Sequence, residues 1–246
     1  MKIIINGAGG RMGKEVVRLA EEGFGGASVA AKADISYETN GDEYKKLADF
    51  SGAADCIIDF SHHSAAAEIT EYAVENNIPA VIASTGQTPE EIELIKAASK
   101  KVPIFLSANM SLGVALLVEL AKITAKNFPY ADIEIIEKHH NRKLDAPSGT
   151  ALLVAEAIKS VREKTKFVFG RHGQAKRTPE EIGIHAVRMG NIIGEHEVIV
   201  GTDTQTITLK HEAHSRALFA EGAIKAAAFL QGKPAGLYNM ESMIND

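Results

Sequence analysis

Lys2-Ile3-Ile4-Ile5-Asn6-Gly7-Ala8-Gly9-Gly10-Arg11-Met12-Gly13 is the stretch that decides how the first part of the chain folds. The apolar run over residues 2–6 predicts a buried strand, and the apolar spacing over residues 16–20 predicts a helix directly after the glycines. Glycines at such a turn let the backbone bend tightly and bring the free amides of the helix start close to a pyrophosphate. The spacing departs by one residue from the strict dinucleotide pattern, because Met12 stands where a glycine is expected. The candidate cofactor contacts here are Gly7, Gly9, Gly10, Arg11, Met12 and Gly13.

A second strand is expected over residues 28–34, and it ends in Asp34. A ribose-binding carboxylate is expected about twenty residues beyond the last glycine of such a motif, so Asp34 is the candidate for the ribose hydroxyls. A solvated charge at the strand end is the alternative for this residue. Lys32 shares its side of the strand and is a candidate for the extra phosphate of NADP. The choice between NADH and NADPH therefore stays open.

Strands and helices alternate from residue 2 to residue 106, which predicts a Rossmann-like, doubly wound parallel sheet of the α/β class. Short polar or flexible loops follow the expected strands at residues 59–61, 84–86 and 108–110. Loops at this edge of a parallel sheet rim the ligand crevice, although residues 84–86 can also be read as a simple turn. The candidate cofactor contacts in these loops are Phe60, Ser84, Thr85, Gly86, Ala108, Asn109 and Met110.

The pattern changes after residue 110. A long helix over 111–128 and strands over 131–138, 184–189, 195–200 and 205–211 predict an α+β region with a mixed open sheet. The last two strands are expected to pair antiparallel across a polar turn. A final helix over 216–230 carries a row of alanines, which suits close packing back onto the first domain. We expect a dinucleotide-binding domain from residues 1–110 and 216–246, and a substrate and oligomerisation domain from residues 111–215.

Residues 171–181 are polar and basic and lack periodicity, which predicts an exposed, solvated loop. Contact of its cations with a cofactor or a neighbouring subunit is the weaker alternative.

Titratable and charged side chains are most concentrated in the stretch Glu137-Lys138-His139-His140-Asn141-Arg142-Lys143-Leu144-Asp145-Ala146-Pro147-Ser148-Gly149-Thr150. This polar stretch follows an apolar strand and precedes a helix, so it is expected to be a loop at a strand's carboxyl end. An imidazole with a pKa near neutral can donate a proton, and a lysine can stabilise developing negative charge. His139 and Lys143 are the candidates for these roles. The histidines are adjacent rather than four residues apart on a helix, so no metal is expected.

Composition limits the other possibilities. The chain has 246 residues, a formal net charge of −5 and a single cysteine, Cys56, which lies in a strand that is expected to be buried. The charges are interspersed, so neither a nucleic-acid surface nor a disulfide framework is indicated. The first residues lack a basic leader, and no apolar run is long enough to span a bilayer. We expect a cytoplasmic protein without membrane partners.

The motifs together resemble the 4-hydroxy-tetrahydrodipicolinate (dihydrodipicolinate) reductase family over nearly the whole chain. The most specific element is Glu137-x-His139-His140-x-x-Lys143-x-Asp145-Ala146-Pro147-Ser148-Gly149-Thr150-Ala151. The other matching motifs, in chain order, are the glycine turn at 7–13, Asp59-Phe60-Ser61, Ser84-Thr85-Gly86, the segment 108–113, the segment 188–196, and Ser215-Arg216.

The resemblance implies an oxidoreductase of lysine and diaminopimelate biosynthesis that uses NADH or NADPH. Its substrate is the dehydrated form of 4-hydroxy-tetrahydrodipicolinate, a small dicarboxylate, and its assembly is a homotetramer built through the second domain's sheet. The implied roles are proton donor for His139 and cationic partner for Lys143. The implied substrate contacts are His140, Ser148, Gly149, Thr150 and Arg216.

The chain departs from the family pattern in three places: Ala83-Ser84-Thr85-Gly86 replaces Gly-Thr-Thr-Gly, Met110 stands where an aromatic residue is common, and Asn141-Arg142 replaces an Arg-His pair found in some members. Met110 is expected to stack differently against a cofactor ring. Two other functions stay open at this stage. One is a related reductase of another small imine or oxo acid, since the scaffold does not select the substrate. The other is a dinucleotide-sensing module without chemistry.

Overall fold

The computed structural model describes residues 1–162 and 164–246. The chain divides into two compact units: the first unit comprises Met1–Leu112 and Arg216–Asp246, and the second comprises Gly113–Ser215. No helix among the described residues has the length and apolar character needed to cross a membrane.

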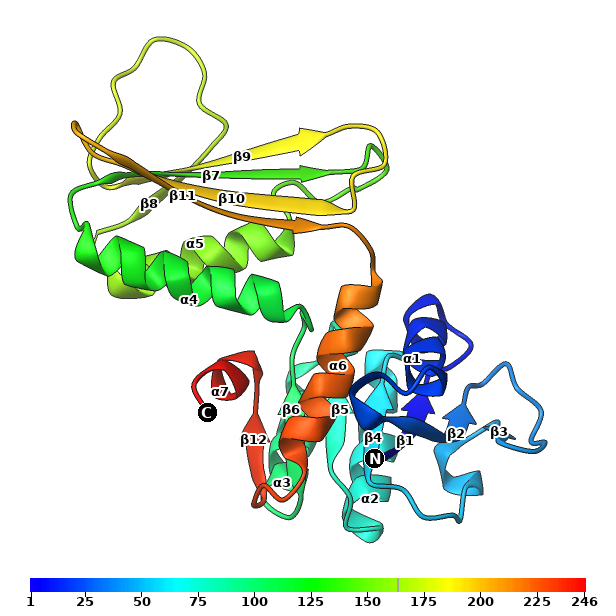
Figure 1. Ribbon diagram of the computed structural model, residues 1–246. Coiled ribbons are helices and arrows are strands. Elements are labelled where there is room, and N and C mark those ends of the chain that lie inside the picture. Colours follow the sequence, from blue (N-terminus) through cyan, green and yellow to red (C-terminus); the bar gives the residue numbers. More distant parts are fainter. Residues whose placement is uncertain (163) are drawn as a thin grey trace. The chain divides into compact units, whose positions relative to one another are not determined.

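The first unit is built on a seven-stranded sheet in the order β12-β6-β5-β4-β1-β2-β3, and all of its pairings are parallel (Figure 1). The predicted doubly wound α/β sheet is therefore confirmed. Its strands are β1 (Lys2–Asn6), β2 (Ser28–Ala33), β3 (Glu43–Tyr44), β4 (Cys56–Asp59), β5 (Ala80–Ile82), β6 (Pro103–Leu106) and β12 (Gly236–Tyr238). The short strands β3 and β12 were not predicted.

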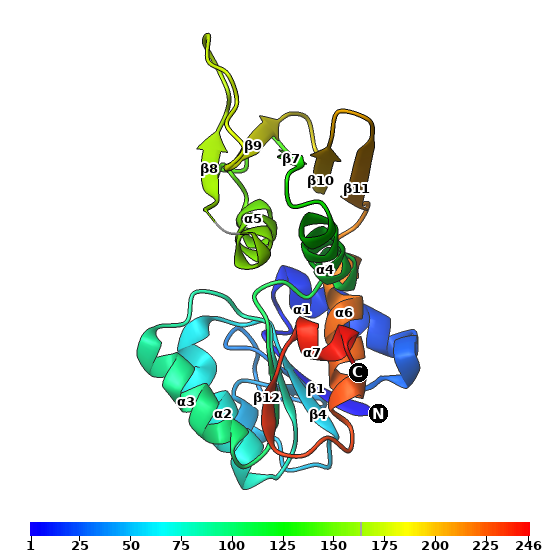
Figure 2. The ribbon, with the colours of Figure 1, turned by 90° about the vertical axis from the view of Figure 1, so that its left-hand side faces the viewer.

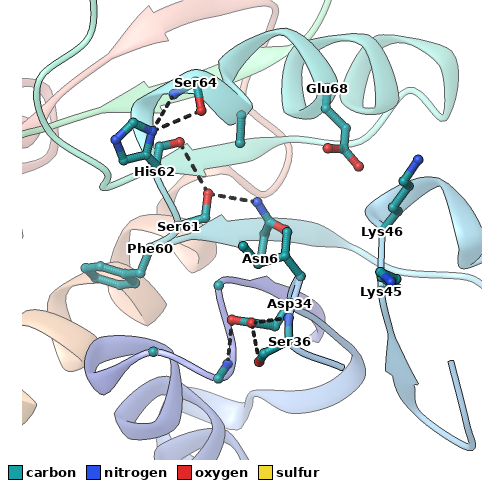
Figure 3. A pocket seen from close by; sticks show the side chains of 15 residues that line it. Asn6, Asp34, Ser36, Lys45, Lys46, Phe60, Ser61, His62, Ser64 and Glu68 are labelled. Atoms are coloured by element: carbon teal, nitrogen blue, oxygen red, sulfur yellow. Dashed lines mark hydrogen bonds between the residues drawn. The ribbon is translucent and has the colours of Figure 1, made fainter. Parts of the chain in front are cut away.

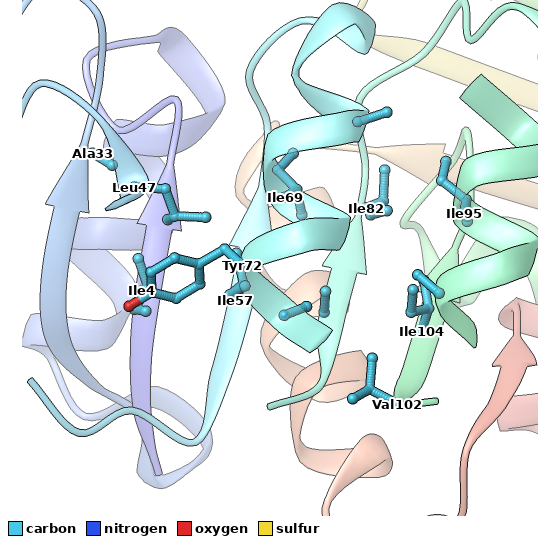
Figure 4. Packing of buried hydrophobic residues seen from close by; sticks show 14 of the residues in the cluster. Ile4, Ala33, Leu47, Ile57, Ile69, Tyr72, Ile82, Ile95, Val102 and Ile104 are labelled. Carbon is cyan, nitrogen blue, oxygen red and sulfur yellow. The ribbon is translucent and has the colours of Figure 1, made fainter. Parts of the chain in front are cut away.

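Helices cover both faces of this sheet (Figure 2). They are α1 (Arg11–Glu21), α2 (Ala66–Glu75), α3 (Pro89–Ser99), α6 (Ala217–Leu230) and α7 (Met240–Ile244), with short 3-10 turns at Phe24–Gly26, Leu47–Asp49 and His63–Ala65. Because both faces are covered, consecutive residues of β1 and β4 are buried, which explains their unbroken apolar runs. Figure 4 shows the core between the sheet and the helices α2 and α3, to which Ile57, Ile69 and Ile95 belong.

Helix α6 packs against α1 and against β4, β5 and β6, as its row of alanines predicted. Ala220, Ala223 and Ala227 are fully buried on that side. A side chain at Gly222 would place its Cβ 1.7 Å from the carbonyl oxygen of Met110, so only glycine fits there. Cys56 is buried in β4, and burial raises the pKa of its thiol, which agrees with a packing role.

The second unit holds a five-stranded mixed sheet in the order β11-β10-β7-β9-β8. Its strands are β7 (Asp132–His139), β8 (Lys166–Phe169), β9 (Glu181–Arg188), β10 (Gly194–Gly201) and β11 (Thr206–Ala213), and its helices are α4 (Leu112–Asn127) and α5 (Gly149–Val161). The predicted antiparallel pairing of β10 with β11 is confirmed, with Val198 opposite Leu209. Strand β8 was not predicted.

Only one face of this second sheet is covered by helices of the described residues, α4 and α5 (Figures 1 and 2). Along β7 the residues toward the helices are buried, and they include Ile133, Ile135, Glu137 and His139. The alternate residues lie on the opposite, open face. The alternation therefore turns two polar side chains at the end of β7 inward.

Residues 171–180 of the predicted loop 171–181 are mostly exposed, but Glu181 is buried as the first residue of β9. Arg177 is an exception, because its guanidinium pairs with Asp132 and Glu134 at the start of β7. Arg171 likewise pairs with Glu181, the first residue of β9. The loop is thus tied to the edge of its own sheet by two arginines.

Candidate active site

A cavity of about 700 Å³ lies in the first unit, at the carboxyl ends of β1, β2 and β4 (Figure 3). This is the edge at which a doubly wound sheet binds its ligands. The cavity is lined by Asn6, Gly7, Gly9, Gly10, Asp34, Ile35, Ser36, Lys45, Lys46, Phe60, Ser61, His62, Ser64, Ala65 and Glu68.

The glycine turn forms one wall of this cavity. Gly7 has a φ of +79°, a conformation that other residues rarely adopt, and its amide donates to the carbonyl of Ala33 at 2.8 Å. A Cβ at Gly13 would lie 2.1 Å from the carbonyl oxygen of Gly7, so this glycine permits close packing of α1 on the strand. The helix begins after Gly10 without a side-chain cap. Its first amides are therefore available to an anion.

Asp34 stands at the end of β2 beside this turn. Its Oδ2 accepts a hydrogen bond from the amide of Gly9 at 2.9 Å, and its Oδ1 accepts from the hydroxyl of Ser36 at 2.6 Å. Burial raises the pKa of Asp34, but these hydrogen bonds outweigh it and leave the pKa below its ordinary value. The carboxylate is thus held ionised in the cavity wall, where a diol could bind it.

The cations near Asp34 differ from those expected. Lys32 pairs with Asp42 at 3.2 Å and with Glu43 at 3.6 Å. Lys45 and Lys46 line the cavity instead. Their approach depends on the two-residue strand β3, which carries no recognisable sequence signal.

At the end of β4, the buried carboxylate of Asp59 organises the next loop. Its Oδ1 accepts from the side-chain amide of Asn6 at 2.9 Å and from the hydroxyl of Ser61 at 2.5 Å. Asn6 also donates to Ser61 at 3.1 Å (Figure 3). This network joins the ends of β1 and β4 and fixes the part of the cavity wall that includes Phe60.

The second unit contains the histidine cluster. Nδ1 of His139 lies 2.5 Å from Oε2 of Glu137, a carboxylate that is fully buried. Arg188 of β9 donates to both oxygens of the same carboxylate, at 2.8 and 2.7 Å. The amide of Ser148 donates to Oε1 at 3.0 Å. Glu137 therefore connects the end of β7 to β9 and to the start of α5.

His196 of β10 lies next to this cluster. Its ring contacts the ring of His139 edge-on with centroids 5.2 Å apart, and its Nε2 lies 3.0 Å from the hydroxyl of Ser148. Burial lowers the pKa of His196 to about 4, so this ring is neutral near pH 7. Burial also lowers the pKa of His139, where Glu137 opposes the effect and the cations of Lys143 and Arg188 add to it.

The loop after His139 brings positive charge and helix amides together. The ammonium of Lys143 lies 2.8 Å from the carboxylate of Asp145. Lys143 lowers the pKa of this carboxyl, and the backbone amides of Asp145 and Gly149 contribute in the same direction. Nδ1 of His140 is buried and lacks a partner among the described residues. The loop over residues 143–149 therefore already stabilises one carboxylate, that of Asp145.

Comparison with known proteins identifies the family. The profile described as "Dihydrodipicolinate reductase, N-terminus" matches residues 1–110, and the one described as "Dihydrodipicolinate reductase, C-terminus" matches residues 113–244. The chain belongs to the dihydrodipicolinate reductase family. The members of this family are oxidoreductases that use NADH or NADPH.

Curated relatives cover essentially all of this reductase chain. The 4-hydroxy-tetrahydrodipicolinate reductase of Caldanaerobacter subterraneus subsp. tengcongensis is 47% identical over 99% of the chain and 98% of the relative. The Clostridium tetani enzyme of the same name is 44% identical over 100% of the chain and 97% of its own length. A solved structure of dipicolinate-bound dihydrodipicolinate reductase from Paenisporosarcina sp. TG-14 aligns with a TM-score of 0.80 at 26% identity, covering 97% of both chains.

The predicted cofactor residues of the reductase occupy different positions relative to the cavity. Five of them line it: Gly7, Gly9, Gly10, Asp34 and Phe60. Arg11, Met12 and Gly13 form the first turn of α1, residues 84–86 follow β5, and residues 108–110 follow β6. Met110 is buried against Gly222, so its side chain is part of the packing rather than of an open ring-stacking surface.

The predicted substrate residues mostly cluster in the second unit, where His139, His140, Lys143 and residues 148–150 lie around the end of β7 and the start of α5. Ser148 uses its amide for Glu137, and its hydroxyl caps the amide of Ala151. Its main contribution is therefore to shape the loop. Arg216 is exposed at the amino end of α6 and belongs to the first unit.

Several residues that surround His139 were not predicted as site residues from the sequence. Glu137 and Arg188 flank His139, and both lie in the family motifs, but a charged residue in a strand gives no sign of which way it faces. The sequence also does not indicate that Gly194 lies beside His139, although a Cβ at position 194 would lie 3.1 Å from Nε2 of His139. Only the sheet register brings β7, β9 and β10 together.

Proposed function

We propose that the chain reduces the dehydrated form of 4-hydroxy-tetrahydrodipicolinate to tetrahydrodipicolinate, a step in lysine and diaminopimelate biosynthesis. The proposal rests on one observation: a chain that matches the family over its full length also has two sites suited to its ligands. One is a dinucleotide-sized cavity beside a glycine turn. The other is a buried histidine next to a carboxylate-stabilising loop. The cofactor and the dicarboxylate each have a matching chemical environment.

The cavity residues fit a nicotinamide dinucleotide. A Cβ at Gly9 would lie 2.9 Å from the Asp34 carboxylate, so glycine at this position preserves the space between turn and carboxylate. The amides that begin α1 bind the pyrophosphate, and Asp34 accepts hydrogen bonds from the ribose hydroxyls. Ile35 is 89% exposed beside Asp34 and offers apolar surface for the adenine. When bound, the cofactor supplies the hydride.

His139 holds and releases the proton at Nε2. Its Nδ1 is engaged by Glu137, so the proton is exchanged through the other ring nitrogen. Because burial lowers the pKa of His139, its imidazolium form gives up a proton more readily than a free imidazolium, and the negative charge of a bound dicarboxylate favours its formation. The ammonium group of Lys143 stabilises the charge that develops on the substrate.

The substrate carboxylates bind where the loop already favours negative charge. Gly149 and Thr150 begin the 13-residue helix α5, and the amide of Gly149 already helps to stabilise the Asp145 carboxylate. His140 offers a buried ring nitrogen, and Ser148 fixes the loop. Lys143 exchanges Asp145 for a substrate carboxylate. Arg216 is proposed as a further substrate contact on the family resemblance alone.

The test is a coupled assay with the purified chain, the upstream synthase, pyruvate and aspartate semialdehyde, followed by the absorbance of NADH or NADPH. Consumption of reduced cofactor that depends on the synthase is the expected result. An absence of turnover with both cofactors refutes the proposal. Turnover of 2-oxo acids with ammonia, but not of the synthase product, favours a reductase of another imine.

The proposal includes a homotetramer assembled through the open face of the second sheet, in the cytoplasm. This face carries the apolar side chains of Ile136 and Ile199, and Lys138 pairs there with Glu195 at 3.0 Å. A sheet face that no helix of the described chain covers and that carries apolar side chains beside paired charges suits association of copies. Sedimentation velocity of the wild type is expected to give a tetramer, and Ile199→Asp is expected to give smaller species. A monomeric wild type refutes this part.

A further inference from the structure

Two charged side chains lie behind His139, on the side away from Nε2. The Glu137 carboxylate accepts from Nδ1 of His139 at 2.5 Å and from both terminal nitrogens of Arg188 at 2.8 and 2.7 Å. Arg188 is itself fixed, because it donates to the carbonyl oxygens of Val187 at 2.8 Å and of Asp145 at 2.5 Å. The three side chains therefore form a rigid series from a cation through an anion to the imidazole.

The two charges act on the imidazole in opposite directions. A carboxylate on Nδ1–H stabilises the imidazolium and so strengthens the hold of Nε2 on its proton. Arg188 neutralises part of that carboxylate and adds its own repulsion. The other charged or titratable groups that face His139 are His196 from β10 and Lys143 from the following loop.

We propose that Glu137 and Arg188 are positioning residues that set the proton affinity of His139 in opposite directions. Glu137 fixes the ring with Nδ1–H inward and raises the affinity, and Arg188 limits that rise so that Nε2 can release its proton. Gly194 keeps the outer face of the ring open, since a Cβ there would lie 3.1 Å from Nε2. The inference rests on the proposed function for the identity of the proton donor.

A purely structural role for Glu137 is a real alternative, because its Oε1 also accepts from the amide of Ser148 at 3.0 Å. Loss of this contact would disturb the start of α5 and lower activity without any specific effect on a proton. The distinguishing observable is the sign of the change in the pKa of His139. Distortion alone gives no reason for the two variants to move that pKa in opposite directions.

The experiment is an NMR titration of the histidine ring carbons in the full-length protein, with the His139 signal assigned by its loss in His139→Gln. Glu137→Gln is expected to lower the pKa of His139 by about one unit or more, and Arg188→Met is expected to raise it by a similar amount. The control is Glu195→Gln, which removes a carboxylate bonded to Lys138 on the open face of the sheet. It is expected to leave the pKa of His139 unchanged.

Steady-state rates add a second readout. In the pH profile of kcat, activity is expected to fall as pH rises past the pKa of His139. This fall is expected to occur at lower pH in Glu137→Gln and at higher pH in Arg188→Met. If Glu137→Gln does not fold, the double variant Glu137→Gln/Arg188→Met also removes the arginine that Glu137→Gln leaves unpaired, and its His139 pKa is expected to lie near that of the wild type and below that of Arg188→Met.

Shifts of the same sign in both single variants, or none, overturn the inference. For the double variant, a His139 pKa at or above that of Arg188→Met does so. The titration needs no turnover, so it fails independently of the proposed function, which the coupled assay of the wild type tests.

Discussion

Gly194 faces the ring of His139 so closely that a Cβ at position 194 would lie 3.1 Å from Nε2. Gly194 is the first residue of β10, and His139 is the last residue of β7, its antiparallel neighbour. The absence of a side chain at 194 thus leaves room beside Nε2, the nitrogen that is proposed to carry the proton. The pairing of the two strands, rather than any local motif, creates this relationship.

Gly194→Ala is expected to lower kcat about tenfold or more while leaving the affinity for NADH unchanged, because its methyl group crowds Nε2 and displaces the ring. Steady-state kinetics and calorimetric titration with NADH measure the two effects. Gly201→Ala at the other end of β10 is the matched control, since its Cβ would meet only the Thr206 hydroxyl, at 4.0 Å. Equal rates for wild type and Gly194→Ala would show that Nε2 is not the reacting nitrogen.

His196 makes stability depend on pH. Its pKa is about 4 in the folded chain, against a model-peptide value near 6.5, so the unfolded chain binds more protons between these values. The free energy of unfolding therefore decreases as pH falls from about 6.5 toward 4. The slope of the free energy of unfolding against pH reports how many protons are taken up on unfolding. In His196→Gln this uptake is expected to be smaller by about one proton, as measured by urea unfolding at several pH values. An unchanged slope would place the titration elsewhere.

Lys45 and Lys46 are expected to favour NADPH. Both line the cavity near Asp34, where a lysine ammonium can pair with an extra phosphate. The double variant Lys45→Ala/Lys46→Ala is expected to raise KM for NADPH about tenfold and to change KM for NADH less than about twofold.

Lys32→Ala is the control for this prediction, since Lys32 is engaged by Asp42 and Glu43. If Lys32→Ala alone abolished the use of NADPH, the strand lysine would be the phosphate contact after all.

The sequence is informative where a pattern is local. The strand, glycine turn and helix at residues 2–21 are recognisable because buried parallel strands need apolar runs and the turn needs glycine. The order of strands and helices up to residue 106 and the pairing of β10 with β11 follow from the same periodicities. The short strands β3, β8 and β12 escape prediction because their residues are only partly buried and so lack the apolar run that marks the equally short strands β4 and β5.

The candidate site shows the same division. His139, Lys143 and the helix start at Gly149 lie within one continuous segment, so their grouping can be predicted. Glu137 faces inward only because β7 alternates, and Arg188 reaches it only through the pairing of β7 with β9. Lys45 replaces Lys32 in the cavity because acidic neighbours hold the strand lysine. The direction in which these side chains face, and the lysine that lines the cavity, depend on tertiary contacts that the periodicity of the sequence does not predict.

The most direct test of the account compares wild type with His139→Gln in the coupled assay, together with the affinity of each for NADH. Loss of a general acid is expected to lower kcat by about 100-fold or more. The affinity for NADH should stay within about twofold, because the cavity and His139 lie in different units of the chain. A His139→Gln variant that consumes cofactor at the wild-type rate would contradict the central claim that this imidazole delivers the proton.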